Sequence, residues 1–476
     1  MHVHLIGVAG TAMGALAGLL KRQGHRVTGS DTAFYPPMGD ALTRWGVETM
    51  QGFDPKHLDP APDMVVVGNV CRPSNVEARA AIDGALPYTS LPKALAKFCL
   101  DGRRSFVIAG THGKTTTTAL CAHLLDQVGL APGFLIGGIP LGFSESFRGA
   151  ELGAPFVIEG DEYDSAFFEK TPKFWHYQPE VAVITAIEYD HADIYPDMPS
   201  YRAAFAGFVE RLPEQGLLVA NAADPEVRAV AQRARCRVSY YALDGEDTGE
   251  ITPEWLIAPA PVQNGTLPFD LFLGGSSCGR FFSPLFGAYN LKNAVAALAL
   301  CSLATSASLS ELGKALPRFG GVKRRQELRG SADGVRVYDD FAHHPTAVHE
   351  TLLGFRARHP EGHLIAVFEP RSATASRRIH QAGYAQAFGP ADEVLLAPVG
   401  RSEIPVEERL DLGLLAEQLR AAGKHVVLGD SIDALVDEVV RNAKHGSSVV
   451  AMSNGAFGNI HDKLLCALAL RAEQRG

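Results

Sequence analysis

A glycine-rich stretch, AGTHGKTTTTAL at residues 109–120, constrains the fold of this chain most strongly. The apolar run RSFVIA precedes it and a helical pattern that stops at Gly129 follows it, so the segment predicts a strand, a tight loop and a helix. The backbone N–H groups of such a loop bind phosphate oxygens, Lys114 adds a positive charge, and a threonine hydroxyl binds Mg²⁺. The spacing GxxGKT is two residues shorter than in an ordinary Walker loop, and a purely structural turn is the alternative.

Length and composition indicate a globular protein of several domains. The 476 residues, 46% hydrophobic and 20% charged, are too many for one ordinary core and suggest about three folding units. A formal charge of −9, mixed along the chain, argues against a nucleic-acid partner, and no apolar run is long enough for a membrane span. Seven dispersed cysteines favour a reducing, cytoplasmic setting. No obligatory protein partner is inferred.

The N-terminal run MHVHLIGVAGTAMGALAGLLKR is apolar and rich in small residues, as a secretion signal is. It lacks a positively charged beginning, and a polar helix end follows it, so we interpret it as a strand, a turn and a helix. The turn, GVAGTAMG, differs from the GxGxxG of dinucleotide sites, although Asp31 ends the next strand where a ribose contact is expected. A different diphosphate-bearing nucleotide is the favoured ligand; a dinucleotide and a simple tight turn remain alternatives.

Apolar runs alternate with helical segments in three successive units, which predicts an α/β protein of three domains. Residues 1–101 form a Rossmann-like domain. Residues 102–321 form a central P-loop ATPase domain with a parallel sheet (FLIGG, FVIEGDE, VAVITAI and GLLVAN) plus antiparallel hairpins between about residues 251 and 288. Residues 322–476, with VRVYDDF, LIAVFEP, EVLLAPV, HVVLG and SVVAMSN, form a second Rossmann-like domain.

Two strand ends carry candidate metal ligands. Glu159 follows the apolar strand FVI and opens the acidic stretch EGDEYD, and His191 follows the strand VAVITAI. The carboxyl ends of parallel strands meet ligands, so a carboxylate there, near the Thr115 hydroxyl, is expected to hold Mg²⁺. A solvated acidic loop and a structural histidine are the alternatives.

Three further motifs are weaker when each is taken alone. GAYNLKN places Asn290 and Asn293 one turn apart at a helix start, where helix capping is the alternative, and VKRRQELRG contains Arg325. YDDFAHHPTAV contains Asp340 and the pair His343 and His344. Paired histidines suggest a metal, but no third ligand at a characteristic spacing accompanies them, so no zinc site is predicted.

In this order, GTHGKTTT, EGDEYD, EYDHADIY, GAYNLKN, KRRQELRG and DDFAHHPT resemble the motifs of the Mur ligases, ATP-dependent amide-forming enzymes of peptidoglycan synthesis. The resemblance runs from end to end. The HHPT form is similar to the branch that acts on UDP-N-acetylmuramate. GTAMGALA, SDTAFYPPM, GNVCRPSN, IEYDHADIY, FEPRSAT and MSNGAFGNIH are most similar to members that attach the preformed tripeptide L-alanyl-γ-D-glutamyl-meso-diaminopimelate during peptidoglycan recycling. The alternative is the member that adds L-alanine, whose first turn is GGAGMGG-like.

The resemblance implies a role for each matching residue. ATP phosphates are expected at Gly110, Thr111, His112, Gly113, Lys114, Thr115 and Thr116, and Mg²⁺ at Thr115, Glu159 and His191. Asn290 and Asn293 are expected on the adenine side, and Arg325 and Asp340 are expected to bring the third domain onto the nucleotide. The catalytic set is then Lys114, Glu159, His191, Arg325 and Asp340. Substrate contacts are expected at Gly10, Thr11, Ser30, Asp31 and Asn69 for the UDP-sugar, and at Arg371 for a carboxylate of the peptide.

The chain departs from the family pattern in two places. Tyr289 stands where the family usually has a histidine, so a stacked ring would replace polar recognition of adenine. Some Mur ligases use a carbamylated lysine as an extra metal ligand, but no lysine lies between Phe174 and Leu291. That ligand is therefore not expected unless a lysine from elsewhere folds in, and His191 becomes the expected partner of the metal.

Two interpretations from other classes stay open. A nucleotide-dependent oxidoreductase would explain the opening strand, turn and helix, but it would leave GTHGKTT without a role. A non-catalytic ATP-binding regulator would use the same loop without a second nucleotide site.

Overall fold

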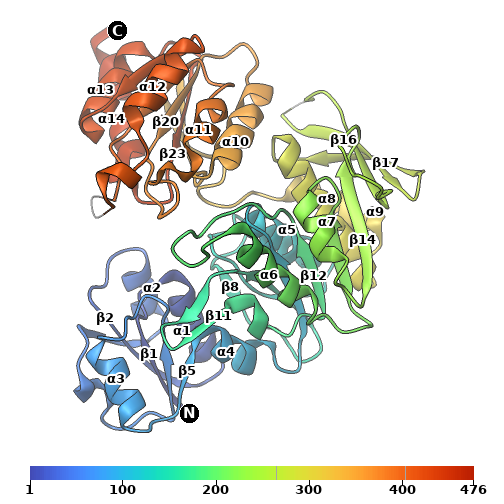
Figure 1. The fold of residues 1–476 in the computed structure, drawn as a ribbon, viewed down its shortest axis with the longest axis vertical. Coiled ribbons are helices and arrows are strands. Elements are labelled where there is room, and N and C mark those ends of the chain that lie inside the picture. Colours follow the sequence, from blue (N-terminus) through green and yellow to red (C-terminus); the bar gives the residue numbers. More distant parts are fainter. Residues whose placement is uncertain (264, 402–403, 476) are drawn as a thin grey trace.

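Three sheet-based units follow one another along the chain, in blue, green and orange-red in Figure 1. The computed structural model describes residues 1–263, 265–401 and 404–475, and the strands within these ranges form four sheets. The α/β fold with parallel sheets and antiparallel hairpins is confirmed, whereas the domain boundaries near residues 101 and 322 stay predictions.

The N-terminal unit is built on a parallel sheet of order β3-β2-β1-β4-β5. The order reverses between β1 and β4, and open α/β sheets bind ligands at such a switch point. The strands are β1 (His2–Ile6), β2 (Arg26–Asp31), β3 (Glu48–Gln51), β4 (Met64–Val67) and β5 (Tyr88–Ser90). The helices are α1 (Thr11–Arg22), α2 (Met38–Arg44), α3 (Val76–Asp83), α4 (Leu91–Leu95) and its continuation η2 (Ala96–Leu100).

The central unit holds a mixed sheet of order β17-β16-β15-β14-β13-β12-β6-β9-β7-β8. Its middle strands are parallel, and β15 to β17 at one edge and β8 at the other run antiparallel to a neighbour. The strands are β6 (Arg104–Ala109), β7 (Gly133–Leu135), β8 (Phe147–Arg148), β9 (Pro155–Gly160), β12 (Val181–Ile184), β13 (Leu217–Asn221), β14 (Arg237–Leu243), β15 (Trp255–Pro259), β16 (Leu267–Leu273) and β17 (Ser276–Ser283). A separate hairpin joins β10 (Asp164–Ala166) and β11 (Glu169–Pro172).

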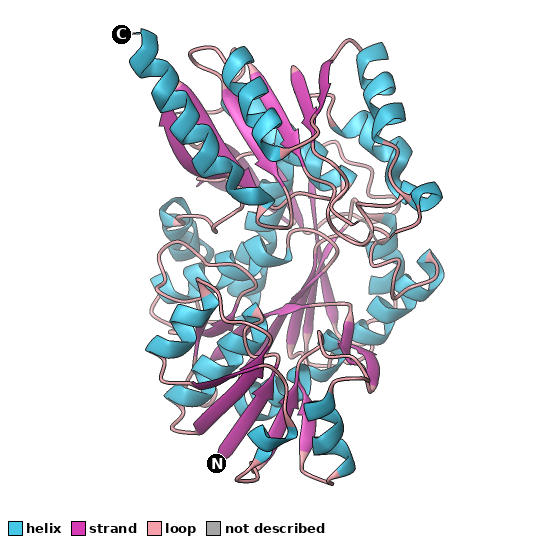
Figure 2. Ribbon diagram, turned by 90° about the vertical axis from the view of Figure 1, so that its left-hand side faces the viewer, coloured by secondary structure: helices cyan, strands magenta, loops and turns pink. Residues whose placement is uncertain are grey.

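Helices cover both faces of the central sheet, as the side view in Figure 2 shows. Strands covered on both faces have nearly continuous apolar sequences, which explains why RSFVIA and VAVI could be predicted as strands from the sequence. The helices are α5 (Lys114–Gln127), α6 (Met198–Val209), α7 (Pro225–Ala231), α8 (Ala288–Ala304) and α9 (Leu309–Ala315).

The C-terminal unit has a sheet of order β18-β19-β23-β20-β21-β22, parallel except for the edge strand β18. The strands are β18 (Glu327–Ala332), β19 (Val335–Asp340), β20 (Leu364–Phe368), β21 (Glu393–Leu396), β22 (His425–Leu428) and β23 (Ser448–Met452). The helices are α10 (Pro345–Arg358), α11 (Gln381–Ala387), α12 (Leu412–Ala421), α13 (Ile432–Asn442) and α14 (Ile460–Arg475). None of the helices in the described ranges has the length and apolar character of a membrane span.

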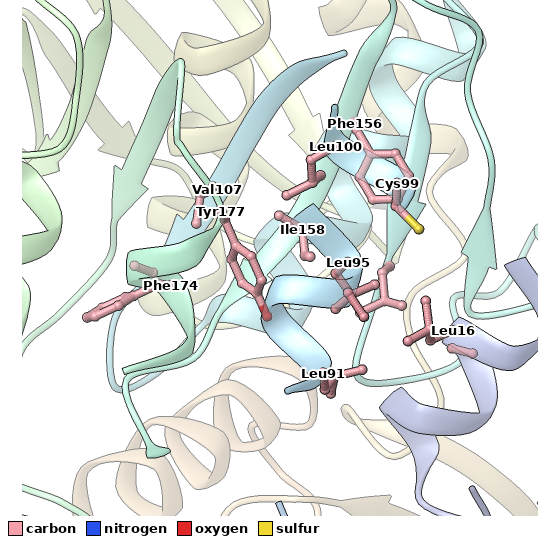
Figure 3. Packing of buried hydrophobic residues seen from close by; sticks show 14 of the residues in the cluster. Leu16, Leu91, Leu95, Cys99, Leu100, Val107, Phe156, Ile158, Phe174 and Tyr177 are labelled. Atoms are coloured by element: carbon pink, nitrogen blue, oxygen red, sulfur yellow. The ribbon is translucent and has the colours of Figure 1, made fainter. Parts of the chain in front are cut away.

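Apolar packing joins the first two units. One buried cluster continues from Leu16 of α1 through Leu91 and Leu95 of α4 to Phe156 and Ile158 of β9, as Figure 3 shows. Within the described residues, by contrast, the two apolar clusters of the C-terminal unit draw only on positions from 332 onward. The first two units therefore share a core, while the third meets the central unit mainly through polar side chains.

Candidate active site

The phosphate loop needs glycine at two positions. Gly110 has φ +130° and Gly113 has φ +81°, a range that L side chains rarely adopt. A Cβ atom would lie 2.1 Å from Thr185 Oγ1 at Gly110 and 2.5 Å from Asn293 Oδ1 at Gly113. Gly113 precedes α5 without a capping side chain, so the first N–H groups of the helix are open to an anion.

Lys114 lies at the start of α5 and is largely buried. Its Nζ donates to the carbonyl of Gly110 at 2.7 Å and to Glu162 Oε2 at 2.9 Å. Burial opposes the charge of Lys114, but Glu162 and Asp161 outweigh it and raise the pKa of the ammonium. The site therefore keeps a fixed positive charge beside the loop.

Glu162 is a residue beside the phosphate loop that the sequence did not single out. Its carboxylate is 1% exposed and lies between Lys114 and His191, whose Nε2 is 3.2 Å from Glu162 Oε1. Burial raises the pKa of Glu162, but the two cationic partners lower it to about 2. Conversely, burial lowers the pKa of His191 and Glu162 raises it above its ordinary value. His191, expected beside Glu159, is thus held by Glu162 in this structure.

Glu159 faces the other side of the same helix start. Its Oε2 accepts from Thr115 Oγ1 at 3.0 Å, and its Oε1 accepts from the Gly137 amide at 2.5 Å. Burial and the charge of Asp161 raise the pKa of Glu159. Among the described residues this buried carboxylate has neutral hydrogen-bond donors and makes no ion pair, and oxygen ligands of this kind suit Mg²⁺. These residues fit the expected magnesium site.

Arg325 and Asp340 lie at the start of the C-terminal unit. Arg325 Nη2 donates to Thr115 Oγ1 at 3.4 Å, a long contact that reaches into the phosphate loop. Asp340 is buried and accepts from the amides of Gln326 at 2.7 Å and Ala342 at 2.8 Å. Burial raises the pKa of Asp340, and Arg325 partly offsets this. Asp340 therefore holds the chain segment that presents Arg325.

Asn290 and Asn293 are buried on the first turns of α8. Asn290 Nδ2 donates to the carbonyl of Phe286 at 2.8 Å, and Asn293 Nδ2 donates to Asn290 Oδ1 at 3.3 Å. Neither caps the helix, which begins after Gly287 without a capping side chain. Asn293 packs on Gly113, where an added Cβ would lie 2.5 Å from Asn293 Oδ1. Asn290 and Asn293 therefore border the phosphate loop. The hydroxyl of Tyr289 accepts from Gln326 Nε2 at 2.9 Å.

Thr111 ties the loop to the chain that follows β12. Its Oγ1 donates to the carbonyl of Glu188 at 2.9 Å and accepts from the Glu188 amide at 3.0 Å. Thr116 is buried in the first turn of α5. His112 Nε2 lies 3.6 Å from Glu188 Oε2, beside His344 of the C-terminal unit.

The N-terminal unit contains a cavity of about 630 Å³ at the switch point of its sheet. Gly10 and Asp31 line it, as expected, and so do residues that sequence reasoning missed: Ala9, Thr32, Ala33, Tyr35, Phe53, Val70, Cys71, Arg72, Ser74 and Asn75. Arg72, in the motif GNVCRPSN, was the available signal for a diphosphate. Thr11 is the first residue of α1, which starts after Gly10 without a capping side chain.

Asp31 shapes the turn above this cavity, because its Oδ2 accepts from the Ala9 amide at 2.9 Å. Ser30 lies elsewhere than expected. Its side chain is 0% exposed and donates to Glu77 Oε1 at 2.9 Å, so it supports the cavity from inside the sheet and does not line it. Asn69, in the turn after β4, also lies outside the set of lining residues.

Arg371 follows β20 in the C-terminal unit and is half exposed. Its Nη1 lies 3.5 Å from Glu369 Oε1, and its side chain passes Gly400 and Gly455, where an added Cβ would lie 3.0 Å and 2.3 Å away. The two glycines leave room for the guanidinium. A carboxylate contact at Arg371 stays a prediction.

Comparisons with known proteins find similarity along nearly the whole chain. Three family models match in succession: "Mur ligase family, catalytic domain" at residues 2–103, "Mur ligase middle domain" at 108–301 and "Mur ligase, glutamate ligase domain" at 324–455. The chain is 39% identical to the UDP-N-acetylmuramate–L-alanyl-γ-D-glutamyl-meso-2,6-diaminoheptandioate ligase of Escherichia coli (strain K12), over 99% of both chains. It is 34% identical to the UDP-N-acetylmuramate–L-alanine ligase of Roseiflexus sp. (strain RS-1), over 89% of this chain and 90% of that one.

A solved structure is similar over the same extent. The crystal structure of a murein peptide ligase from Psychrobacter arcticus 273-4 covers 98% of this chain, and this chain covers 99% of it, with a TM-score of 0.71 and 34% sequence identity.

Proposed function

The chain belongs to the Mur ligase family, and from this premise we propose that it joins UDP-N-acetylmuramate to L-alanyl-γ-D-glutamyl-meso-diaminopimelate in an ATP-dependent reaction. One observation carries the proposal. Lys114 and Thr115, at the start of α5, donate hydrogen bonds to two buried carboxylates, Glu162 and Glu159. They do so in a chain that is similar over 99% of its length to a ligase named for these two substrates.

The loop holds ATP so that its terminal phosphoryl passes to the lactyl carboxylate of UDP-N-acetylmuramate, which forms an acyl phosphate and releases ADP. The α-amine of the peptide's L-alanine then attacks the acyl carbon. The tetrahedral intermediate expels phosphate and loses a proton, which leaves an amide. Lys114 and the open N–H groups of α5 stabilise the charge on the transferring oxygens.

Thr115 and Glu159 would hold Mg²⁺, with His191 turning toward it from Glu162. A bound Mg²⁺ would neutralise charge on the nucleotide phosphates. The cavity near Gly10 and Asp31 holds the uridine diphosphate end, with the open N–H groups of α1 facing its phosphates. The C-terminal unit holds the peptide, with Arg371 pairing with one of its carboxylates.

An assay of amide formation with tripeptide and with free L-alanine, each with ATP and UDP-N-acetylmuramate, tests the substrate. Release of phosphate that requires both UDP-N-acetylmuramate and the tripeptide is the expected result. Preference for free L-alanine would establish the closest alternative, UDP-N-acetylmuramate:L-alanine ligase. A nicotinamide-dependent reaction would favour an oxidoreductase, and ATP binding without turnover would favour a regulator.

The magnesium assignment predicts that Glu159→Gln raises the Mg²⁺ concentration needed for half-maximal phosphate release by about 10-fold or more, because the amide removes the charged ligand. The measurement is an Mg²⁺ titration of phosphate release at saturating ATP. Glu151→Gln, an exposed carboxylate of the same unit, is the control. Equal Mg²⁺ requirements for wild type and Glu159→Gln would contradict the assignment.

A place in peptidoglycan recycling follows from a preformed tripeptide as the amine substrate. We place the protein in the cytoplasm, because ATP and nucleotide sugars are found there and its seven cysteines are free thiols.

A further inference from the structure

Three ionisable side chains outside the magnesium site converge where the C-terminal unit meets the phosphate loop. His112 comes from the loop, Glu188 from the chain after β12, and His344 from the residue before α10. Each brings one ligand atom, and these atoms all lie within 4.8 Å of one another. The sequence indicated only the pair His343 and His344. His112 and Glu188, the other two members of the cluster with His344, are far from that pair along the chain.

The separations suit a small transition-metal ion. Glu188 Oε2 is 3.6 Å from His112 Nε2 and 3.5 Å from His344 Nδ1. Two ligand atoms on a tetrahedral Zn²⁺, at bond lengths of about 2.0–2.1 Å, lie roughly 3.3 Å apart. Both contacts to Glu188 are close to that value, and the nitrogens of the two histidines lie within 4.8 Å of each other.

The histidine nitrogens lack other partners. His112 Nε2 and both ring nitrogens of His344 are buried and have no hydrogen-bond partner among the described residues. His344 is only 7% exposed, so its unpartnered ring nitrogens are shielded from solvent. His380, whose Nε2 is likewise buried and unpartnered within the described part of the chain, packs against it with ring centroids 4.4 Å apart.

The surroundings hold Glu188 in place. Thr346 Oγ1 donates to Glu188 Oε2 at 2.6 Å, and Thr111 binds both the amide and the carbonyl of Glu188. Hydrogen bonds that orient a ligating carboxylate are a regular feature of metal sites. Two imidazoles and one carboxylate favour Zn²⁺ and its neighbours, because imidazole suits these ions, whereas Mg²⁺ is bound mainly by oxygen ligands.

We propose that His112, Glu188 and His344 form a Zn²⁺-type metal site that joins the C-terminal unit to the phosphate loop. It is separate from the magnesium site at Thr115 and Glu159, and it does not depend on which peptide the enzyme uses. An ion bound there links the C-terminal unit to the phosphate loop, so it stabilises the arrangement of these units seen in this structure.

Co²⁺ is the probe, since a tetrahedral Co²⁺ site absorbs visible light. The full-length protein is treated with EDTA, freed of chelator, and titrated with Co²⁺ in the absence of nucleotide. The expected result is one Co²⁺ per chain with a visible absorption band, which Zn²⁺ abolishes on displacement and which millimolar Mg²⁺ leaves in place. No band at stoichiometric protein and metal would overturn the proposal.

Variants locate the ion. His344→Gln and Glu188→Gln should each weaken Co²⁺ binding about 10-fold or more. His425→Gln, an exposed histidine beside Glu393 in the same unit, and His191→Gln should keep the wild-type titration. Retention of the band in both His344→Gln and Glu188→Gln, or its loss in His191→Gln, would show that the ion binds elsewhere. Thermal melting of each variant checks folding, and Glu188→Gln preserves side-chain size should His344→Gln unfold.

Discussion

At the scale of single residues, neighbouring carboxylates of one short stretch have different partners. EGDEYD contains Glu159, which accepts from Thr115, and Glu162, which pairs with Lys114 and His191. Burial raises the pKa of Glu159, whereas two cations lower the pKa of Glu162 to about 2. Glu159, which accepts from the Thr115 hydroxyl and makes no ion pair within the described part of the chain, is therefore the candidate Mg²⁺ ligand, and Glu162 holds the two cationic side chains in position.

Replacing Lys114 tests the phosphate loop. Lys114→Met keeps the length of the side chain and removes its charge, so phosphate release at saturating ATP should fall about 10²–10³-fold, in the range found when a stabilising donor is lost. Lys170→Met, at an exposed ion pair with Asp164, should retain activity. A folded Lys114→Met enzyme with wild-type turnover would exclude the proposed role.

At the scale of elements, the start of helix α5 depends on backbone geometry. Gly113 has a positive φ and lies directly before α5. A Cβ there would lie 2.5 Å from Asn293 Oδ1, so the loop, the start of α5 and α8 are in close contact at Gly113. The N-terminal unit has a comparable junction, where buried Glu77 of α3 accepts from His4 of β1 at 2.5 Å and Ser30 of β2 at 2.9 Å. Both junctions lie directly beneath a proposed ligand site.

Gly113→Ala should weaken ATP binding about 10-fold or more, because the added Cβ meets Asn293 and the backbone is strained by roughly 1–2 kcal/mol. Calorimetric titration with ATP measures the affinity. Gly129→Ala, at the other end of α5, has nearly the same φ, +80°, and nothing within 4 Å of the added Cβ. Its ATP affinity should stay at the wild-type value. Equal losses in both variants would assign the effect to strain alone.

Glu77→Gln should lower the melting temperature of the N-terminal unit, since a buried charge-assisted hydrogen bond contributes about 1–3 kcal/mol. Burial raises the pKa of Glu77, but His4, Ser30 and His57 outweigh this and hold it below the ordinary 4.5. This stabilisation is present above pH 4.5 and is lost as the pH falls through the lowered pKa. The difference from wild type should therefore be largest near neutral pH and shrink below pH 4.5.

Melting curves recorded at several pH values measure this difference. Glu48→Gln, at an exposed ion pair with Arg26, should change the melting temperature little at any pH. A difference between wild type and Glu77→Gln that stays constant from pH 7 to pH 4 would contradict the assignment of the stabilisation to the Glu77 charge.

At the scale of the whole molecule, the units are joined in two ways. The first two share a buried apolar cluster, whereas Arg325, Gln326 and Thr346 of the third reach the central unit by hydrogen bonds. Because polar contacts exchange readily with water, we expect the third unit to be the one that opens and closes around substrates.

A bulky side chain placed between the central and third units should lower turnover without changing the affinity for UDP-N-acetylmuramate. Gly354 of α10 faces the central unit, and a Cβ there would lie 2.8 Å from Gln326 Nε2 and 3.2 Å from the Phe286 carbonyl. Gly354→Leu should lower kcat on the order of 10²-fold by displacing the third unit, while the affinity for UDP-N-acetylmuramate stays unchanged. Steady-state kinetics and direct binding measure the two. Leu353→Gln, on the exposed side of α10, is the control; an unchanged kcat in Gly354→Leu would argue against closure.

The sequence by itself determined the α/β class, the alternating units, the phosphate loop, and Thr115 and Glu159 as neighbours at strand and helix ends. Most of these features are local, because contiguous residues whose period or turn chemistry has one main structural outcome determine them. The exception is the pair Thr115 and Glu159, which are 44 residues apart and were expected to be close because ligands meet the carboxyl ends of parallel strands. The resemblance to the Mur ligases was also recognised from the sequence alone, because it depends on the order of the motifs along the chain.

Only the tertiary structure decided which carboxylate pairs with Lys114, that Ser30 is turned into the sheet, that Tyr289 bonds to Gln326, and that His112, Glu188 and His344 meet. Each depends on strand order or on how two units pack, so the residues concerned come together across long separations along the chain. No local pattern records such contacts, because the forces that select them act on the packed molecule as a whole.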